Sequence, residues 1–400
     1  SFRHILRNSL GDPADRQLRD DIIIVPLDEL LYEEYGSFPF RRTDLGKIAS
    51  TLNRLGASVI GLDFLMDFRS SYGEDEPTAA MFAEGDKTLL VSFASFSDGQ
   101  FQNLTYPNDV LRESTKSGYS NLEDTSAIVG NLARLRIHES ITNNKDGWPF
   151  AIQALALYWN VEPTLENGVL KLGEHATIPL DHNGDMYIDF PQLDAETQYL
   201  SQGQVGFSAL EILDIQNFED LSKEEIEEYE YIFADKIVLV GDTWEVTHDK
   251  FNTPVGPVYG VEIIADTINT ILNGAPLRPA SMLVETISTF FFLVLLLCTG
   301  VLRNMLVRLL AGFMVYILFT GVATFLYSSL GIVISMTYAM LAGFLAMVFM
   351  SFRSYSIAEQ NQRVSLADSA ESNRMLGLAF QAQGQLDSAF EKFRKCPRDE

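Results

Sequence analysis

Cysteine is scarce in this chain: only Cys298 and Cys396 are present. The first 278 residues contain none, which excludes a disulfide framework for that region. A region of this length can build a full hydrophobic core without covalent cross-links, so the lack of cysteine does not indicate a cellular compartment.

Positive charge is also scarce. The chain carries 29 Lys and Arg against 54 Asp and Glu, which gives a formal net charge of −25 at pH 7. Nucleic-acid binding needs clustered Lys and Arg to neutralise phosphates, so we expect no nucleic-acid partner. The acidic run Glu224–Glu228 is typical of a solvated helix face, which keeps its region soluble and away from anionic lipid.

The common catalytic and nucleotide-binding motifs are missing. The sequence contains no G-x-G-x-x-G, no G-x-x-x-x-G-K-[ST] and no H-E-x-x-H pattern, and the protein-kinase signatures are absent as well. No residues combine a nucleophile with a base and oxyanion donors. An enzyme within these 400 residues is therefore the least favoured class, and we expect no cofactor.

Charge is almost missing from residues 281–351, where apolar runs follow one another at 282–302, 306–326 and 330–350. A helix that rises about 1.5 Å per residue needs about 20 residues to cross a hydrocarbon core of about 30 Å. Buried helices of a soluble protein usually keep polar positions along one face, and these runs have few. We therefore predict three transmembrane helices, with Glu285 near the membrane interface.

The few positive charges around the runs predict the topology. Arg303 lies in the first connection and Arg308 just after it, Arg353 and Arg363 follow the third run, and the second connection carries no charge. Short cytoplasmic loops are enriched in Lys and Arg. We expect residues 351–400 in the cytoplasm and residues 1–281 outside it, with a signal anchor or cleaved signal peptide before Ser1.

The first elements of the large N-terminal region form a β-α-β pattern. Ile22–Leu27 is a β-branched run typical of a buried strand, and Ser58–Leu62 is the next strand. Between them, helical spacing begins at Thr43 as the N-cap and ends before Gly56 as the C′ residue. A right-handed crossover predicts that the two strands are parallel neighbours.

The remaining elements are expected from shorter patterns. Strands are predicted at Thr88–Phe93, Ile137–Ser140, Tyr187–Phe190 and Lys236–Val240, and helices at Pro149–Tyr158, Glu219–Tyr231 and Val261–Leu272. Together they predict an α/β sandwich with a mostly parallel central sheet. A three-helix membrane domain and a short α-helical tail complete the expected fold.

Acidic side chains follow three of the predicted strands, and the C-terminal ends of parallel strands gather at one edge, where α/β sheets bind ligands. The candidate ligand-binding residues at this edge are Asp28, Arg41, Asp63, Asp242, His248 and Asp249, with Arg42 beside them. Two interpretations stay open. One is a small-ligand or cation site, with catalysis as its minor variant. The favoured one is structural: the acids cap helices, accept loop amide bonds and pair with Arg.

Asp181–Asp185 has the rhythm of a calcium loop. Its Gly stands at the fourth position and Gln192 at the twelfth, which breaks the EF-hand pattern. Asn183 and Gly184 instead predict a hairpin turn between strands at 177–180 and 187–190. We expect no metal site.

Short motifs along residues 1–278 resemble, in the same order, those of the CHASE2 extracytoplasmic sensor domain. They are Asp20–Asp28, Phe38–Arg41, Leu55–Phe64, Gly118–Asn121, Trp148–Ala151, Phe233–Gly241, His248–Asp249, Thr253–Pro254 and Gly260–Glu262. CHASE2 domains are typically followed by three membrane helices, as predicted here. Trp244–Thr247 is bulky and charged where the family usually has a small, Gly-containing loop, which puts a ligand site on that loop in doubt.

The resemblance implies a multi-pass receptor of the bacterial cytoplasmic membrane. Its sensor would meet an unidentified ligand or protein in the periplasm and would pass the signal to a cytoplasmic kinase or cyclase. The small-xxx-small pair Ala339 and Gly343 favours close helix packing within one chain or in a homodimer.

The tail begins what resembles a tetratricopeptide repeat. Gly377, Gly384, Ala389 and Phe393 fall at the spacings of its helix pair, and Leu386–Pro397 resembles the juxtamembrane region of bacterial CHASE2-bearing serine/threonine protein kinases. One repeat cannot bury its own face, so we expect further repeats, a partner or another domain beyond residue 400. A kinase receptor is favoured. A non-catalytic membrane anchor that recruits proteins through its tail, and the receptor part of a nucleotide cyclase, stay open.

Overall fold

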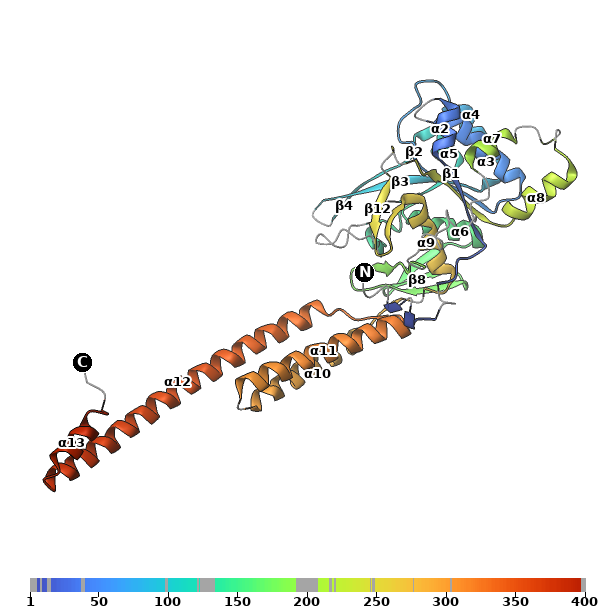
Figure 1. Cartoon of the computed structure of the whole chain (residues 1–400). Coiled ribbons are helices and arrows are strands. Elements are labelled where there is room, and N and C mark those ends of the chain that lie inside the picture. Colours follow the sequence, from blue (N-terminus) through green and yellow to red (C-terminus); the bar gives the residue numbers. More distant parts are fainter. Residues whose placement is uncertain are drawn as a thin grey trace. The chain divides into compact units, whose positions relative to one another are not determined.

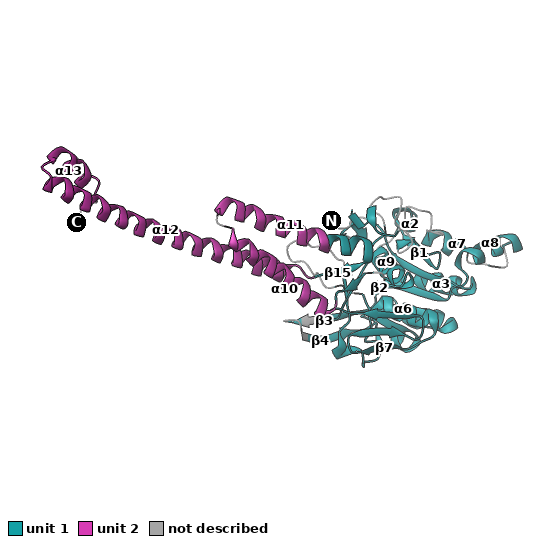
Figure 2. Ribbon diagram, turned by 90° about the horizontal axis from the view of Figure 1, so that it is seen from below, with its two compact units in different colours: residues 1–280, 324–334 teal, residues 281–323, 335–400 magenta. Residues whose placement is uncertain are grey.

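The computed structural model describes the chain except residues 1–5, 8, 13–15, 37–39, 98–99, 121, 123–133, 192–207, 216–217, 219–220, 245, 247–248, 276, 303 and 397–400. It divides into two compact units, which are coloured separately in Figure 2. Unit 1 contains residues 1–280 and 324–334, and unit 2 contains residues 281–323 and 335–400.

Unit 1 is built on a central sheet of six strands (Figure 1). The order is β1 (Ile22–Leu27), β11 (Ile237–Asp242), β2 (Val59–Leu65), β3 (Thr88–Ser97) and β4 (Gln100–Thr105), and β5 (Lys116–Tyr119) also pairs with β3. All pairings are parallel except that of β3 with β4. The predicted α/β fold with a mostly parallel sheet is confirmed.

The predicted adjacency of β1 and β2 is wrong, although their parallel direction is confirmed. β11 lies between them and pairs with both. Every residue of β11 from Ile237 to Gly241 is buried, so this apolar strand needs neighbours on both sides and takes a central place. The crossover through α3 (Arg42–Arg54) therefore skips one strand position.

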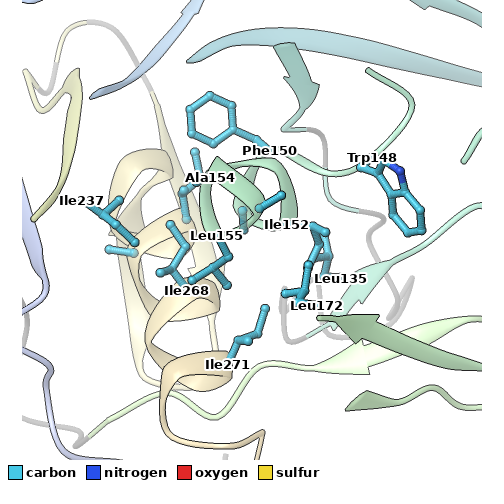
Figure 3. Packing of buried hydrophobic residues seen from close by; sticks show 14 of the residues in the cluster. Leu135, Trp148, Phe150, Ile152, Ala154, Leu155, Leu172, Ile237, Ile268 and Ile271 are labelled. Atoms are coloured by element: carbon cyan, nitrogen blue, oxygen red, sulfur yellow. The ribbon is translucent and has the colours of Figure 1, made fainter. Parts of the chain in front are cut away.

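Helices cover both faces of the sheet, and strand side chains alternate between them. In β1, Ile22 and Ile24 pack on the side of α6 (Phe150–Trp159) and α9 (Gly260–Leu272). Ile23 and Val25 pack on the opposite side, which α2 (Glu29–Tyr35), α3 and α7 (Ala209–Asp214) cover. Figure 3 shows the first of these two cores, where α6 and α9 meet beside Ile237.

The N-cap predicted at Thr43 is two positions late, since Arg41 is the N-cap of α3. Gly56 follows the helix with a φ of 87°, as expected of a C′ glycine. The predicted helices near residues 150, 223 and 261 are α6, α8 (Lys223–Phe233) and α9. The run Glu224–Glu228 lies on α8 with its glutamates exposed.

The smaller elements of unit 1 surround the sheet. They are α4 (Asp75–Phe82), α5 (Asp109–Ser114), the 3-10 turns Glu84–Asp86 and Glu139–Ile141, β6 (Arg134–Arg136), β7 (Pro163–Glu166), β8 (Val169–Leu172), β9 (Ala176–Pro179), β10 (Asp185–Tyr187), β12 (Lys250–Thr253) and β13 (Gly256–Tyr259). β7, β8 and β9 form an antiparallel sheet, β6 pairs with β10, and β12 pairs with β13.

Two strand predictions are shifted: β6 ends before Ile137, and β10 ends at Tyr187. The predicted turn at Asn183 is present, because the Gly184 N–H donates to the Asp181 carbonyl over 3.0 Å. The predicted hairpin around it is wrong, since β9 pairs with β8 and β10 with β6. The Asp181 carboxylate accepts the backbone N–H groups of Asn183 and Asp185, so it stabilises this turn.

Within the described residues, three helices are long and apolar enough to cross a membrane. The first is α10 (Met282–Cys298), extended by a 3-10 turn at Thr299–Val301, and the second is α11 (Met305–Leu330). The third, α12 (Thr337–Ala382), begins seven residues later than the predicted 330, because Gly331 has a φ of 65° and Ile332–Val333 form the short strand β15. α12 then continues unbroken through 46 residues into the tail.

Small and polar residues hold the helices of unit 2 together. A Cβ on Gly343 would lie 2.7 Å from the Phe292 ring and from the Tyr316 hydroxyl, so close packing at this predicted small residue is confirmed. Arg308 donates to the Leu302 carbonyl over 2.7 Å and also contacts the Ser354 hydroxyl. Near the C-terminus, α12 and α13 (Leu386–Phe393) form a helical hairpin.

Candidate functional site

The sequence predicts that six residues gather at one sheet edge, but the structure distributes them. Asp28 is the N-cap of α2, where its Oδ1 accepts the Leu31 N–H over 3.0 Å, so its role is structural. Arg41 is exposed before α3. His248 lies outside the described residues. Arg42 is committed elsewhere, since its Nη1 donates to Asp75 over 2.6 Å in a buried ion pair.

Asp242, at the end of β11, lies on the side of the sheet that α2 covers. Its Oδ2 accepts the Tyr32 hydroxyl over 2.8 Å, and its Oδ1 accepts the Trp244 N–H over 3.0 Å. Burial and this carboxylate raise the pKa of Tyr32 well above its ordinary value. Asp242, Tyr32 and Arg41 line a groove of about 810 Å³.

Asp63 belongs to the opposite face, and strand geometry explains why. In the register of β2 against β11, Gly61 lies beside Leu239 and Leu62 beside Val240. Because side chains alternate along a strand, Asp63 shares the face of Gly61 and of α6 and α9, whereas Asp242 shares the face of Val240. The two acids lie near the ends of the neighbouring strands β2 and β11 but enter different sites.

A cavity of about 420 Å³ lies beside Asp63. Its lining combines Asp63 and Asp249 with the aromatic residues Phe93, Tyr119, Phe150 and Phe251. Tyr119 and Phe150 are 1% exposed, while Phe93 and Phe251 are more than 40% exposed. A deep aromatic wall therefore continues into an accessible one. Gly260, Ile264 and Thr267 of α9 complete this side of the cavity.

The two carboxyl groups of the cavity are hard to ionise. Burial, with the negative charges of Asp249 and Asp242, raises the pKa of Asp63 from 3.8 to about 7. Burial and Asp242 also raise the pKa of Asp249 from 3.8 to about 6, while the Gly260 N–H opposes that rise. Within the part of the chain that the structure describes, no donor forms a hydrogen bond with the Asp63 carboxylate. Both acids would gain from a cationic partner.

The aromatic wall is the part of the site that strand-end reasoning misses. Tyr119 and Phe150 come from two of the sequence motifs that resemble CHASE2, and the structure joins these motifs: the Tyr119 N–H donates to the Trp148 carbonyl over 3.2 Å. Gly118 allows this approach, because a Cβ there would lie 2.7 Å from the Phe150 Cα. The glycine before Tyr119 is the sequence signal that could have indicated the contact.

A second group of contacts in unit 1 forms what we call the junction, made of Arg7, Asp189, Thr270 and residues 278–280 and 327–333. Arg7 and Asp189 form a buried ion pair with a shortest N–O distance of 2.5 Å, and both side chains are 1% exposed. Arg7 also donates to the carbonyls of Tyr327 and Ser328, over 3.1 and 3.4 Å. These carbonyls belong to the last turn of α11, whose C-terminal groups lack helical partners.

The other contacts of the junction are backbone hydrogen bonds. β14 (Arg278–Pro279), which precedes α10, pairs in parallel with β15, and the Arg278 N–H donates to the Gly331 carbonyl over 2.8 Å. The Asp189 N–H donates to Thr270 Oγ1 of α9 over 3.1 Å. The junction thus joins the N-terminal segment, α9, the residues before α10 and the connection from α11 to α12.

An α/β domain with a lined cavity, followed by helices that could span a membrane, fits a membrane protein of the receptor class. The model of the CHASE2 domain family matches residues 2–303, which is more than half of the chain, and the protein belongs to this family. CHASE2 is a sensor domain. The match extends past the predicted 278 and includes α10. Neither the curated proteins nor the solved structures gave a match to the chain.

Proposed function

We propose that this chain is the sensor and transmembrane part of a bacterial signalling receptor. Its α/β domain lies outside the cytoplasm, and its tail passes the signal to a cytoplasmic serine/threonine protein kinase encoded beyond residue 400. The tail hairpin of α12 and α13 supports this reading, because Gly377 packs against the Phe393 ring as in the small-on-large contacts of a tetratricopeptide pair.

The observation that carries the proposal is the position of α9 between the cavity and the junction. Thr267 lines the cavity, and Thr270, about one turn further on, accepts the Asp189 N–H of the junction. α9 is buried along nearly its whole length, from Val261 to Ile271. A ligand that displaces the start of α9 therefore acts on a helix whose next turn holds the junction.

The mechanism is a population shift. A ligand favours the arrangement of α9 and the junction to which it binds more tightly, by no more than its difference in affinity between the two arrangements. The junction holds the residues that lead into α10 and α12, and α12 has no break between its apolar first half and the tail. The bias can thus reach the tail without a flexible linker.

The proposed topology is supported by the charges and by β15. Residues 324–334, the end of α11 and the start of its connection to α12, belong to unit 1, and β15 within them pairs with β14. The second connection then lies on the side of the sensor. The first connection, together with Arg308 in the first turn of α11, lies on the cytoplasmic side with the tail.

Cysteine labelling tests this topology. In a Cys298→Ala background, a membrane-impermeant maleimide applied to spheroplasts should not label Cys396, but should label a cysteine introduced at the exposed Lys171. Labelling of both after lysis is the control. Labelling of Cys396 in sealed spheroplasts would contradict the topology.

Sequencing the gene downstream of residue 400 tests the effector. Kinase signatures there would support the proposal. A cyclase domain would show that the effector is a nucleotide cyclase, and repeats without a catalytic domain would show that the protein is a membrane scaffold. Signal transfer is tested by hydrogen exchange of residues 376–393 in the intact protein. Asp189→Asn disrupts the junction. If the hydrogen exchange of residues 376–393 is the same in this variant, the proposed coupling is refuted.

A further inference from the structure

The lining of the 420 Å³ cavity defines which chemistry it can hold. Its volume is in the range of about 300–1,000 Å³ that is typical of small-molecule sites. Most of the lining side chains are aromatic or aliphatic, and the charged ones are Asp63 and Asp249. Among the described residues that line it there is no Lys, Arg or His. An anion would therefore meet two carboxylates without a compensating charge.

A neutral apolar ligand fits these residues poorly as well. It would fill the cavity but remove water from two carboxyl groups that it could not pair, which costs free energy unless both are protonated. A metal ion is also disfavoured, because no group of three or more His, Cys, Asp or Glu within the described residues could hold one. Hard cations prefer several oxygen ligands, and here aromatic carbon dominates.

An organic cation matches both parts of the lining. Aromatic faces attract ammonium groups, and a nearby carboxylate adds direct charge pairing. The deep wall of Tyr119 and Phe150 offers a place for an apolar body, and Phe93 and Phe251 flank the accessible side. Asp249 lies against the start of α9: its backbone carbonyl accepts the Gly260 N–H over 3.0 Å, and a Cβ on Gly260 would lie 2.7 Å from its Oδ2.

We propose that this cavity binds a small organic cation, an amine or a quaternary ammonium with an apolar body, whose charge is paired by Asp63 and Asp249 within an aromatic wall. This inference rests on the proposed function: the cation is the signal that the sensor detects. Among the described lining residues, the charged groups that face the ligand are Asp63 and Asp249, with Asp242 behind them on the other face of the sheet.

The proposal implies a coupling between ligand and protons. The bound cation favours the ionised carboxylates, so binding releases protons wherever Asp63 or Asp249 is still protonated in the free protein. Binding is therefore tighter at about pH 8 than at about pH 5, where both acids carry protons before the ligand arrives.

Calorimetry on the full chain in lipid nanodiscs tests the site. The probes are choline, phenylethylamine and dimethylbutanol, the neutral isostere of choline with carbon in place of nitrogen. At about pH 8 we expect both cations to bind, and the neutral isostere to bind at least about tenfold more weakly. Asp63→Asn should weaken the cations at least about tenfold. Asp28→Asn is the control: it preserves the cap of α2, lies away from the cavity, and should leave the affinity for both cations unchanged.

Each other outcome overturns the proposal: binding of neither cation, equal binding of choline and its isostere, or unchanged affinity in Asp63→Asn. Asp249→Asn gives the same test if Asp63→Asn does not fold. Binding is measured separately from signal transfer. Cation binding without a change in hydrogen exchange of residues 376–393 would remove the receptor function and keep the site. If the protein binds no cation but the tail still responds to disruption of the junction, the cation site is removed and the receptor function is kept.

Discussion

Replacing Asp189 with Asn should destabilise the α/β domain strongly, because it leaves the Arg7 guanidinium buried without its counter-charge. Three hydrogen bonds of 2.5–3.0 Å join the two side chains, and neither is more than 1% exposed. Water cannot replace the lost carboxylate at such a site. Asn keeps the shape of Asp and one acceptor oxygen, so the change isolates the charge.

The expected loss is about 3–5 kcal/mol, the usual cost of removing one partner of a buried ion pair. This is a large part of a total stability of about 5–15 kcal/mol. The double variant Arg7→Met, Asp189→Leu removes both charges and should lose less than the single change. It should not be neutral, because the carbonyls of Tyr327 and Ser328 at the end of α11 lose their donor.

Thermal unfolding of the full chain in nanodiscs, together with hydrogen exchange of residues 327–334, measures both effects. We expect a lower unfolding temperature and faster exchange in Asp189→Asn, with partial recovery in the double variant. Asp181→Asn, in a surface turn, is the matched control. A loss below about 1 kcal/mol, or a double variant as unstable as the single one, would refute the view that a buried charge pair holds the junction.

Three further predictions follow from other parts of the chain. Asp63 and Asp249 bind protons in the folded protein at pH values where the unfolded chain has released them, so the free energy of unfolding should fall as pH rises from about 4 to about 7, and Asp63→Asn should flatten this dependence in pH-dependent melting curves. Gly118→Ala should cost about 1–3 kcal/mol in chemical denaturation, because its Cβ would meet the backbone of α6; a cost near zero would show that α6 can shift. Gly377→Leu should separate the two helices of the tail hairpin and speed hydrogen exchange of α13 without changing the melting of the α/β domain, because the leucine side chain would take the space that the Phe393 ring of α13 occupies.

The sheet could be predicted because buried parallel strands leave a strong sequence pattern. Ile22–Leu27 is a continuous apolar run, which only a strand covered on both faces requires. The order of the strands could not be predicted in the same way. A crossover fixes direction and hand but not how many strand positions it passes. β11, the strand that lies beside β1, is 215 residues further along the chain, from Ile22 to its partner Ile237.

The sequence predicts one cluster of candidate residues at this edge of the sheet, whereas the structure divides Asp63 and Asp249 from Asp242 between two faces. The sequence predicts the strand ends only approximately, since β2 continues to Leu65 and β11 to Asp242, and the face that each acid occupies depends on the register of neighbouring strands. In this register Asp63 alternates with the face of Leu62, whereas Asp242 shares the face of Val240, the partner of Leu62, so the two acids point to opposite faces. The aromatic wall depends on long-range contacts such as that of Tyr119 with Trp148, which no local pattern encodes.

The junction shows why one side chain can matter more than its local sequence suggests. Arg7 lies in a short segment without a distinctive motif, yet its guanidinium reaches Asp189 and the last turn of α11, residues 182 and 320 positions away. The positive group meets both a carboxylate and the negative end of a helix dipole, so two favourable interactions depend on one position. α9 holds the same carboxylate residue through Thr270 and lines the cavity through Thr267. Because a closely packed helix transmits displacement instead of absorbing it, a ligand beside α9 and the ion pair at the junction should influence each other equally in both directions.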